Sequence, residues 1–231
     1  MKKILAYLLT FVLVVTLWSC DKSTEGLTRI TYYAELTLEG ESTLYVDKGA
    51  TFVEPGYTAV MNGEDVTDQV KVSSNLDTST SGVYTITYSI VNADGFYSTD
   101  QRTVIVTDPN DPIEGYWDTD ANSYRDYNGQ TFYGASYPVL IINNGDGTYN
   151  VEDMLGGWYY YRSGYGSSYA MSGVIAIEGG VVTLVSSYIA GWGDGLDYLE
   201  NGVYDANSKT LSWKVRYAGE LDFYVKMNKR D

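Results

Sequence analysis

Residues 211–227 have the sequence LSWKVRYAGELDFYVKM, which is the clearest fold signal in the chain. An apolar side chain stands at every second position of 211–217, and the same alternation returns in 221–227. Because successive side chains of a strand point to opposite faces of a sheet, each run has one face for packing and one for water. The three residues between the runs, 218–220, include a glycine and suit a tight reversal. The stretch therefore predicts an antiparallel hairpin.

Strand-type alternation recurs upstream of this hairpin, and no window outside the N-terminus shows a sustained helical repeat. Turn signals separate the runs. Residues 143–147 (NNGDG) and the pair Gly179 and Gly180 accept the positive φ that hairpin turns require. We therefore expect an all-β protein.

Residues 108–112 (DPNDP) hold two of the four prolines and can neither continue a strand ladder nor pack as a core. The segment predicts a linker between an N-terminal domain at 27–107 and a C-terminal domain at 113–231. Both are long enough to hold a core of their own. The successive hairpins of the C-terminal domain favour an antiparallel β meander or barrel.

The N-terminal domain contains two recognisable elements, VDKGATFVEPGYTA at 46–59 and GVYTITY at 82–88. Together they resemble bacterial surface immunoglobulin-like domains, which implies a β-sandwich that serves as a spacer or an interaction module. The resemblance brings no catalytic residue. Independently of it, alternation in 84–90 places tyrosine and isoleucine on one face and hydroxyl residues on the other, as a half-buried strand requires.

The composition excludes several classes of function. The chain has no histidine and one cysteine, which rules out Ser-His-Asp and Cys-His catalysis, histidine or thiolate zinc sites and an internal disulfide. A formal net charge of −15 argues against nucleic acid as a partner, because phosphate binding depends on lysine and arginine. Carboxylate chemistry on a glycosidic bond remains open, although no pair among the 30 acidic residues is singled out. We expect no cofactor.

One stretch has part of a calcium-loop spacing, with oxygen-bearing side chains at Asp118, Asp120, Asn122 and Asp126. A calcium loop of this kind has glycine at its sixth position and glutamate at its twelfth, whereas serine and glycine stand there in this chain. The expectation is a solvated turn and no metal site.

The N-terminus has the features of a lipoprotein signal peptide. Lys2 and Lys3 precede an apolar run, 4–17, and Ser19 stands directly before Cys20. This pattern resembles a bacterial lipobox, which implies removal of residues 1–19, lipid on Cys20 and a flexible tether at 20–26. The alternative is an uncleaved membrane span, but the run is shorter than the ~20 residues that a span needs. We therefore expect anchoring by lipid in the outer membrane, facing the cell surface.

Aromatic side chains are concentrated in the C-terminal domain, where sixteen of the 24 tyrosines and four of the five tryptophans lie. Trp117, Trp213 and Phe223 are expected in the core. Flat amphipathic rings stack on sugar rings, and neighbouring glycines leave room for a ligand. Two glycine-rich aromatic segments, 157–169 and 188–198, are therefore candidate binding surfaces. The alternative for these segments is packing against a sheet or a domain interface. The candidate ligand-binding residues are Trp158, Tyr159, Tyr160, Tyr161, Tyr165 and Trp192.

The order of the parts is itself informative. Gly115, Tyr116 and Trp117 resemble the G-x-W opening of lipocalin-like barrels. A lipobox, an immunoglobulin-like domain, a proline linker and a tyrosine-rich β domain together resemble a family of Bacteroidota lipoproteins that accompany SusD-like proteins in glycan uptake. The resemblance implies a non-catalytic cell-surface lipoprotein that binds glycan or supports an outer-membrane transporter complex. Two alternatives remain: a structural or assembly protein that binds protein partners, and a carboxylate glycosidase.

Overall fold

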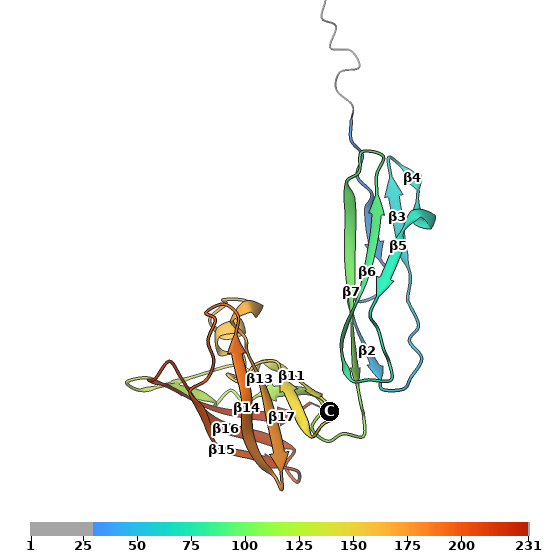
Figure 1. Cartoon of the computed structure of the whole chain (residues 1–231). Coiled ribbons are helices and arrows are strands. Elements are labelled where there is room, and N and C mark those ends of the chain that lie inside the picture. The colour runs from blue at the N-terminus through green and yellow to red at the C-terminus, as the bar shows by residue number, and fades with distance from the viewer. Residues whose placement is uncertain (1–29, 231) are drawn as a thin grey trace, which may run out of the picture.

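The computed structural model describes residues 30–230 and consists of two β domains (Figure 1). The predicted signal peptide at 1–19, the lipid attachment at Cys20 and the tether at 20–26 lie outside the described residues. The all-β prediction is confirmed, since strands make up almost all regular structure. Within the described part of the chain, no helix has the length and apolar character needed to cross a membrane.

The first domain is an immunoglobulin-like sandwich of two small sheets, with strand orders β1-β3-β4 and β2-β7-β6-β5. Strand β2 runs parallel to β7, and the other pairs are antiparallel. The predicted alternation in 84–90 is confirmed, because β6 buries Ile86, Tyr88 and Ile90. The regular elements are β1 (Glu35–Leu38), β2 (Thr43–Asp47), β3 (Tyr57–Met61), β4 (Glu64–Asp65), the 3-10 turn η1 (Thr67–Gln69), β5 (Lys71–Ser74), β6 (Gly82–Val91) and β7 (Tyr97–Thr107).

A fully buried arginine organises one side of this sandwich. Arg102, on β7, forms an ion pair with Glu54 at 3.1 Å and donates hydrogen bonds to the carbonyl oxygens of Glu39 (2.8 Å), Gly56 (3.3 Å) and Glu41. These partners belong to irregular backbone before and after β2. The guanidinium therefore supplies donors to carbonyl groups of irregular backbone, among which that of Gly56 also accepts the Glu39 N–H at 3.0 Å.

The second domain is a closed antiparallel barrel. Eight strands, β8 and β11 to β17, follow one another around a ring that the pairing of β17 with β8 closes. A small hairpin, β9 and β10, extends from the same strand β17. The strands are β8 (Gly115–Thr119), β9 (Tyr124–Asp126), β10 (Gln130–Phe132), β11 (Pro138–Asn143), β12 (Thr148–Val151), β13 (Met171–Glu178), β14 (Val181–Ile189), β15 (Tyr198–Asp205), β16 (Thr210–Tyr217) and β17 (Leu221–Lys229).

The structure confirms the hairpin that the sequence predicts for residues 211–227. β16 and β17 form the expected hairpin, with Trp213 opposite Val225 and Tyr217 opposite Leu221. The alternating side chains of both strands point into the barrel, where Trp213 and Phe223 are buried as predicted. Trp117 is also fully buried, and its indole N–H donates to the carbonyl of Ile113 at 2.7 Å.

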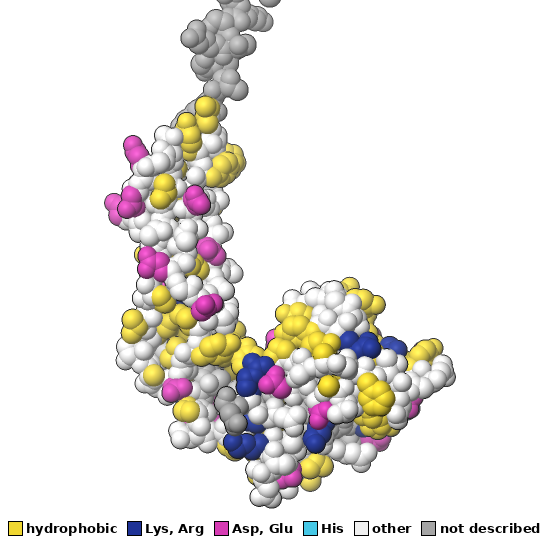
Figure 2. Space-filling model, turned by 180° about the vertical axis from the view of Figure 1, so that it is seen from behind, with side chains coloured by type: hydrophobic (Ala, Val, Ile, Leu, Met, Phe, Trp, Pro, Cys, Tyr) yellow, Lys and Arg dark blue, Asp and Glu magenta, His cyan; other side chains and the backbone are white. Residues whose placement is uncertain are grey.

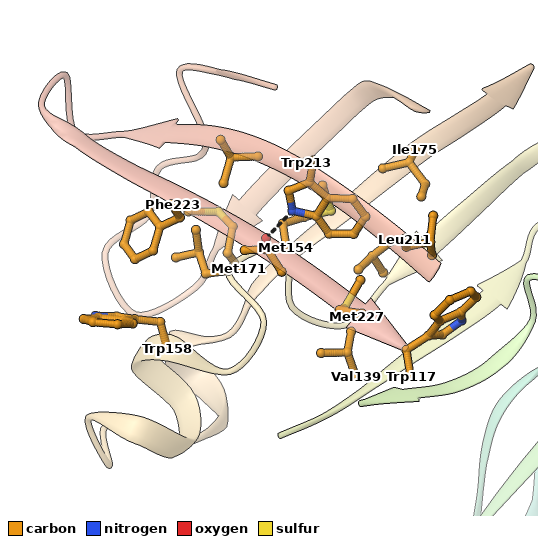
Figure 3. Close-up of a cluster of buried hydrophobic side chains, with 14 of the residues drawn as sticks. Trp117, Val139, Met154, Trp158, Met171, Ile175, Leu211, Trp213, Phe223 and Met227 are labelled. Atoms are coloured by element: carbon orange, nitrogen blue, oxygen red, sulfur yellow. Dashed lines mark hydrogen bonds between the residues drawn. The ribbon is translucent and has the colours of Figure 1, made fainter. Parts of the chain in front are cut away.

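The interior of the barrel is filled by part of its own chain. In the connection between β12 and β13, residues 153–158 turn inward, and we call this segment the plug. Met154 and Leu155 are fully buried. Figure 3 shows Met154 among the inward-facing side chains of the strands. Two carbonyl groups of the plug accept hydrogen bonds from buried side chains. The Trp213 indole N–H donates to the Met154 carbonyl at 2.8 Å, and the Tyr133 hydroxyl donates to the Leu155 carbonyl. The barrel is thus a packed core rather than a ligand-holding cup.

A buried carboxylate holds the plug in shape. Asp153 accepts backbone N–H groups from Leu155 (2.8 Å), Gly157 (3.1 Å) and Met171 (3.2 Å). Burial raises the pKa of Asp153 to about 7, although the three N–H donors act in the opposite direction. Gly157 has a φ of 86°, and a Cβ there would lie 2.7 Å from the Cβ of Tyr137, so the turn requires glycine.

The two domains share a small apolar interface. Ile105 of β7 packs with Leu140 and Ile142 on the outside of β11, and Tyr116 lies against them. The adjoining Glu114 is buried and accepts hydrogen bonds from the Ser81 hydroxyl (3.0 Å) and from the backbone N–H groups of Asp108 and Asn143 (2.9 and 3.2 Å). This carboxylate therefore connects the sandwich, the linker and the barrel.

Candidate functional site

The first of the predicted site residues lies in the core. Trp158 is 2% exposed, so the predicted exposure of this indole is wrong. The guanidinium groups of Arg125 and Arg162 lie over its ring, 4.9 and 4.1 Å from the centroid, and Tyr133 meets it at an angle of 65°. With 2% of its surface exposed, Trp158 has no room for a ligand.

The local backbone explains why the aromatic run divides. Residues Trp158–Arg162 form a single π-helical turn, η2, which begins at the left-handed Gly157. In a helical turn successive side chains point around an axis rather than alternately to two faces. Trp158 and Tyr159 therefore point into the barrel, while Tyr160 and Tyr161 point outward. Tyr159 is nearly buried as well, so packing, the alternative given for this segment, describes both of these side chains.

Around Trp192 the chain builds an aromatic surface, which we call the Trp192 platform. The indole is 44% exposed, and its centroid lies 4.8 Å from those of Tyr159 and Tyr169, 5.9 Å from that of Tyr217 and 6.1 Å from that of Tyr165. Most of these contacts are edge-to-face, which is a favoured geometry for aromatic pairs. The surrounding tyrosines thus fix the orientation of an indole that solvent can still reach.

Glycines make this packing possible. A Cβ at Gly191 would lie 2.4 Å from the Tyr169 ring, so only glycine lets that ring approach the loop between β14 and β15. The 3-10 turn η3 (Ser167–Tyr169) brings Tyr169 to this position, and the Gly191 N–H donates to the Ser168 carbonyl at 2.7 Å. The predicted association of glycine with aromatic side chains therefore has a structural basis here.

The platform has polar groups at its edge. The Tyr217 hydroxyl donates to the carboxylate of Asp194 at 2.9 Å. Burial and this hydrogen bond raise the pKa of Tyr217, so the phenol stays protonated and holds Asp194 in place. An exposed indole face beside a fixed carboxylate can stack on an apolar ring face and accept hydrogen bonds from hydroxyls.

Tyr160 and Tyr161 do not join the platform. Their rings stack at 3.8 Å, and Tyr161 in turn stacks on Tyr137 at 5.7 Å with an interplanar angle of 2°. Tyr160, the outer ring of this stack, lines a hollow between the two domains. The six candidate residues are therefore divided: Trp158 is in the core, Tyr159, Tyr165 and Trp192 form the platform, and Tyr160 and Tyr161 belong to a second surface.

That second surface is a groove of about 960 Å³, which we call the interdomain groove. Its floor is the outside of β11 to β14 and its opposite wall comes from the first domain, through residues such as Val83 and Thr103. Glu152 and Tyr188 line it, and neither is among the six candidate residues, although Tyr188 begins the second glycine-rich aromatic segment. A groove between domains leaves no local signal, because it exists only once the domains have docked.

The acidic stretch around Asp118 has protein partners. Asp118 forms a two-pronged ion pair with Arg230, and Asp120 accepts hydrogen bonds from Asn122 at 2.9 Å. Across the described residues, no group of three or more acidic or cysteine side chains is placed to hold a metal ion. Among the described residues that line the interdomain groove, Glu152 is the sole carboxylate, so the groove does not offer the acid pair of a glycosidase.

Comparisons with known proteins agree with this architecture. A family model described as a bacterial surface protein, Ig-like domain, matches residues 36–106, and a model described as a C-terminal domain matches residues 106–229. The crystal structure of the lipoprotein BT2262 from Bacteroides thetaiotaomicron is 38% identical. That match covers 85% of this chain and 100% of the other, with a TM-score of 0.71.

Other similarities are much weaker. Two structures of the Clostridium perfringens protein ZmpB contain, respectively, CBM51-2 in complex with GlcNAc and INT domains, and the M60 catalytic domain with CBM51-1 and CBM51-2. They are 20% and 16% identical, cover 52% and 87% of this chain and 31% and 21% of theirs, and have TM-scores of 0.27 and 0.29. Similarity at that level does not establish a shared fold. No curated protein matches the chain.

The match to the Bacteroides protein covers 85% of this chain and decides the family. The chain belongs to the family of the lipoprotein BT2262, with a bacterial surface immunoglobulin-like domain followed by that family's C-terminal domain.

Proposed function

We propose that the protein is a non-catalytic lipoprotein of the outer membrane that faces the cell surface and binds glycan through the Trp192 platform. The observation that carries the proposal is the fixed but accessible indole of Trp192. A ring that neighbours already hold in place loses little conformational freedom when a sugar stacks on it, which favours binding. The carboxylate of Asp194 at the platform edge supplies an acceptor for sugar hydroxyls.

The lipid anchor rests on separate support. Cys20 follows a basic and apolar leader and a small residue, and the relative BT2262 is described as a lipoprotein. Acyl chains on this cysteine would hold the protein at a membrane surface.

The proposal is tested by retention of the purified mature chain on a glycan array and in polysaccharide affinity gels. We expect retention by at least one plant, host or microbial polysaccharide and at least a tenfold loss of affinity in Trp192→Ala. Tyr97→Ala is the matched control, because Tyr97 is a 70% exposed aromatic residue of the first domain. If no polysaccharide retains the protein, or if Trp192→Ala binds as wild type does, the platform is not a glycan site.

A second candidate function is assembly with protein partners such as an outer-membrane transporter. It is favoured by exposed apolar side chains at the end of the first domain where the described chain begins, namely Ile30, Tyr33, Phe96 and Tyr97. Tyr33 and Phe96 lie against each other at 5.7 Å. This function predicts co-purification with a transporter that Trp192→Ala leaves unchanged and that a Tyr33→Ser, Phe96→Ser double variant abolishes.

A further inference from the structure

We infer that the interdomain groove is a second carbohydrate site, which takes the uncharged part of a glycan chain and uses the immunoglobulin-like domain as one of its walls. The inference goes beyond the Trp192 platform, since platform binding requires nothing of the first domain. It gives that domain a recognition role in addition to that of a spacer.

The shape of the groove fits an extended ligand. Figure 2 shows the molecule hollowed where the first domain meets the projecting upper part of the barrel domain. The volume of about 960 Å³ is at the upper end of the range for small-molecule sites, about 300–1,000 Å³. The hollow is open to solvent in this view, so a chain of sugars can enter it from outside.

The walls are held at a fixed separation. Ile105 packs on Leu140 and Ile142, and Tyr45 meets Tyr116 edge-to-face at 5.9 Å. The buried carboxylate of Glu114 adds hydrogen bonds to both domains. Because apolar packing and buried hydrogen bonds join the domains, the groove is formed before a ligand arrives.

The lining has the chemistry that sugars require. Tyr160 presents a ring backed by the stack on Tyr161, and Tyr188, 54% exposed, presents another from β14. Between them lie amide and hydroxyl side chains, including Asn150 and Ser186. Aromatic faces with hydrogen-bonding groups between them match the alternating apolar faces and hydroxyls of a sugar chain.

The charge of the groove selects among glycans. Neither lysine nor arginine occurs among its described lining residues, and Glu152 provides its only formal charge. One carboxylate oxygen of Glu152 accepts the Leu140 N–H at 3.0 Å, and no salt bridge within residues 30–230 uses this side chain. Uronate or sulfate groups would be repelled here, whereas sugar hydroxyls could donate to the carboxylate.

The groove also adjoins the platform. Tyr188 lines the groove, and its hydroxyl lies 4.0 Å from where a Cβ on Gly193 would stand, beside Trp192. A glycan chain that stacks on the indole can therefore continue toward Tyr188 and into the groove. Long ligands should depend on both surfaces, and short ones on the platform alone.

Filling the groove from the first domain tests the inference. Val83 is 54% exposed on β6 and lines the groove, so Val83→Arg places a long side chain in it. Val91→Arg is the matched control, because Val91 is also exposed on β6 and lies eight residues further along the same face. Ser186→Arg, from an exposed position on the floor, repeats the test from the barrel side.

The readout is calorimetric titration of the purified mature chain with neutral disaccharides and hexasaccharides of the cello, manno and laminari types and with a galacturonate hexasaccharide. We expect Val83→Arg and Ser186→Arg to lower the affinity for a neutral hexasaccharide at least tenfold and to leave the affinity for the disaccharide unchanged. The control variant Val91→Arg should bind both ligands as wild type does. Unchanged hexasaccharide affinity in both groove variants, or wild-type preference for galacturonate, would overturn the inference.

Trp192→Ala separates this inference from the proposed function. Loss of disaccharide binding in Trp192→Ala with wild-type behaviour of the groove variants would retain the platform and remove the groove. Loss in the groove variants with no effect of Trp192→Ala would retain the groove and remove the platform. Failure of the wild-type protein to bind any of these oligosaccharides would overturn both.

Discussion

The two domains each bury a charged side chain against irregular backbone, but they do so with opposite charges and different surroundings. In the first domain Arg102 donates to carbonyl oxygens on either side of β2 and faces the carboxylate of Glu54 at 3.1 Å. In the second domain Asp153 accepts three backbone N–H groups inside the plug. No salt bridge of the described residues involves Asp153.

The difference shows two ways to stabilise backbone that has no strand partner. A guanidinium carries five N–H donors, so one arginine can satisfy several carbonyls and still meet a counter-ion. A carboxylate has only acceptors, and without a cation it relies on N–H dipoles to offset the cost of burial. The sandwich therefore depends on an ion pair, and the plug depends on a group that a proton can neutralise.

The largest expected effect is from Arg102→Met, which removes the buried counter-ion of Glu54 and the side-chain donor to the carbonyls of Glu39 and Glu41. Removing one partner of a buried ion pair costs about 3–5 kcal/mol. Hydrogen exchange followed by mass spectrometry should show loss of protection in the first domain with the barrel unchanged. The control is Arg216→Met, which breaks the partly exposed pair with Asp222; because Lys214 still pairs with Asp222, the cost should be under about 1 kcal/mol. Equal losses in the two variants would contradict the assigned role of Arg102.

A smaller effect is expected from Asp153→Asn. One oxygen of Asp153 accepts both Leu155 and Met171, and the other accepts Gly157. Asparagine keeps one acceptor and turns an NH₂ group toward a remaining N–H, which leaves a buried donor unpaired at a cost of about 1–3 kcal/mol. Every tryptophan among the described residues lies in the second domain, so urea unfolding followed by tryptophan fluorescence measures this change. An unfolding midpoint equal to that of wild type would show that the plug does not need the carboxylate.

Comparison of these regions also shows what local sequence could predict. Alternation with a period of two placed Tyr88, Trp213 and Phe223 in their cores, because the strand itself determines which face is buried. It failed for Trp158, because the plug is an insertion into a barrel formed by strands distant in sequence. The composition of the loop at Trp192 correctly indicated an accessible ring, since its neighbouring glycines have no side chains to cover it.

Glu114→Gln should have a still smaller effect and should show whether the two domains depend on each other. Glutamine retains one acceptor oxygen, but it brings an NH₂ group toward the N–H donors of Asp108 or Asn143. We expect a loss of about 1 kcal/mol, since one hydrogen bond to a buried group is weakened. The measurement is urea unfolding followed by both tryptophan fluorescence and domain-resolved hydrogen exchange. If the interface couples the two domains, the free energy of unfolding of both should fall. A fall in the barrel alone would mean that the stability of the sandwich does not depend on the interface.

The smallest expected effect is a pH dependence of the second domain that comes from Asp153. Burial raises the pKa of this carboxyl from 3.8 to about 7, so between these values the folded chain holds a proton that the unfolded chain has released. The stability contribution is therefore fully present only below about pH 4, falls progressively as the pH rises toward 7, and is gone once the folded state has also released the proton above about 7. The urea midpoint of the barrel should therefore be lower at pH 8 than at pH 6.

Neighbouring carboxyls define the control for this last measurement. Burial also raises the pKa of Glu152, so this carboxyl contributes to the loss of stability with rising pH in the same direction. The pKa of Asp222 is lowered, mainly by its hydrogen bond from Arg216, and this group changes the stability only below about pH 4. The decisive quantity is thus the difference between wild type and Asp153→Asn at each pH. That difference should change between pH 6 and pH 8, because only wild type can release the buried proton. A difference that stays constant would mean that the N–H groups of the plug keep Asp153 ionised throughout, and the two buried charges would then be alike in their insensitivity to pH.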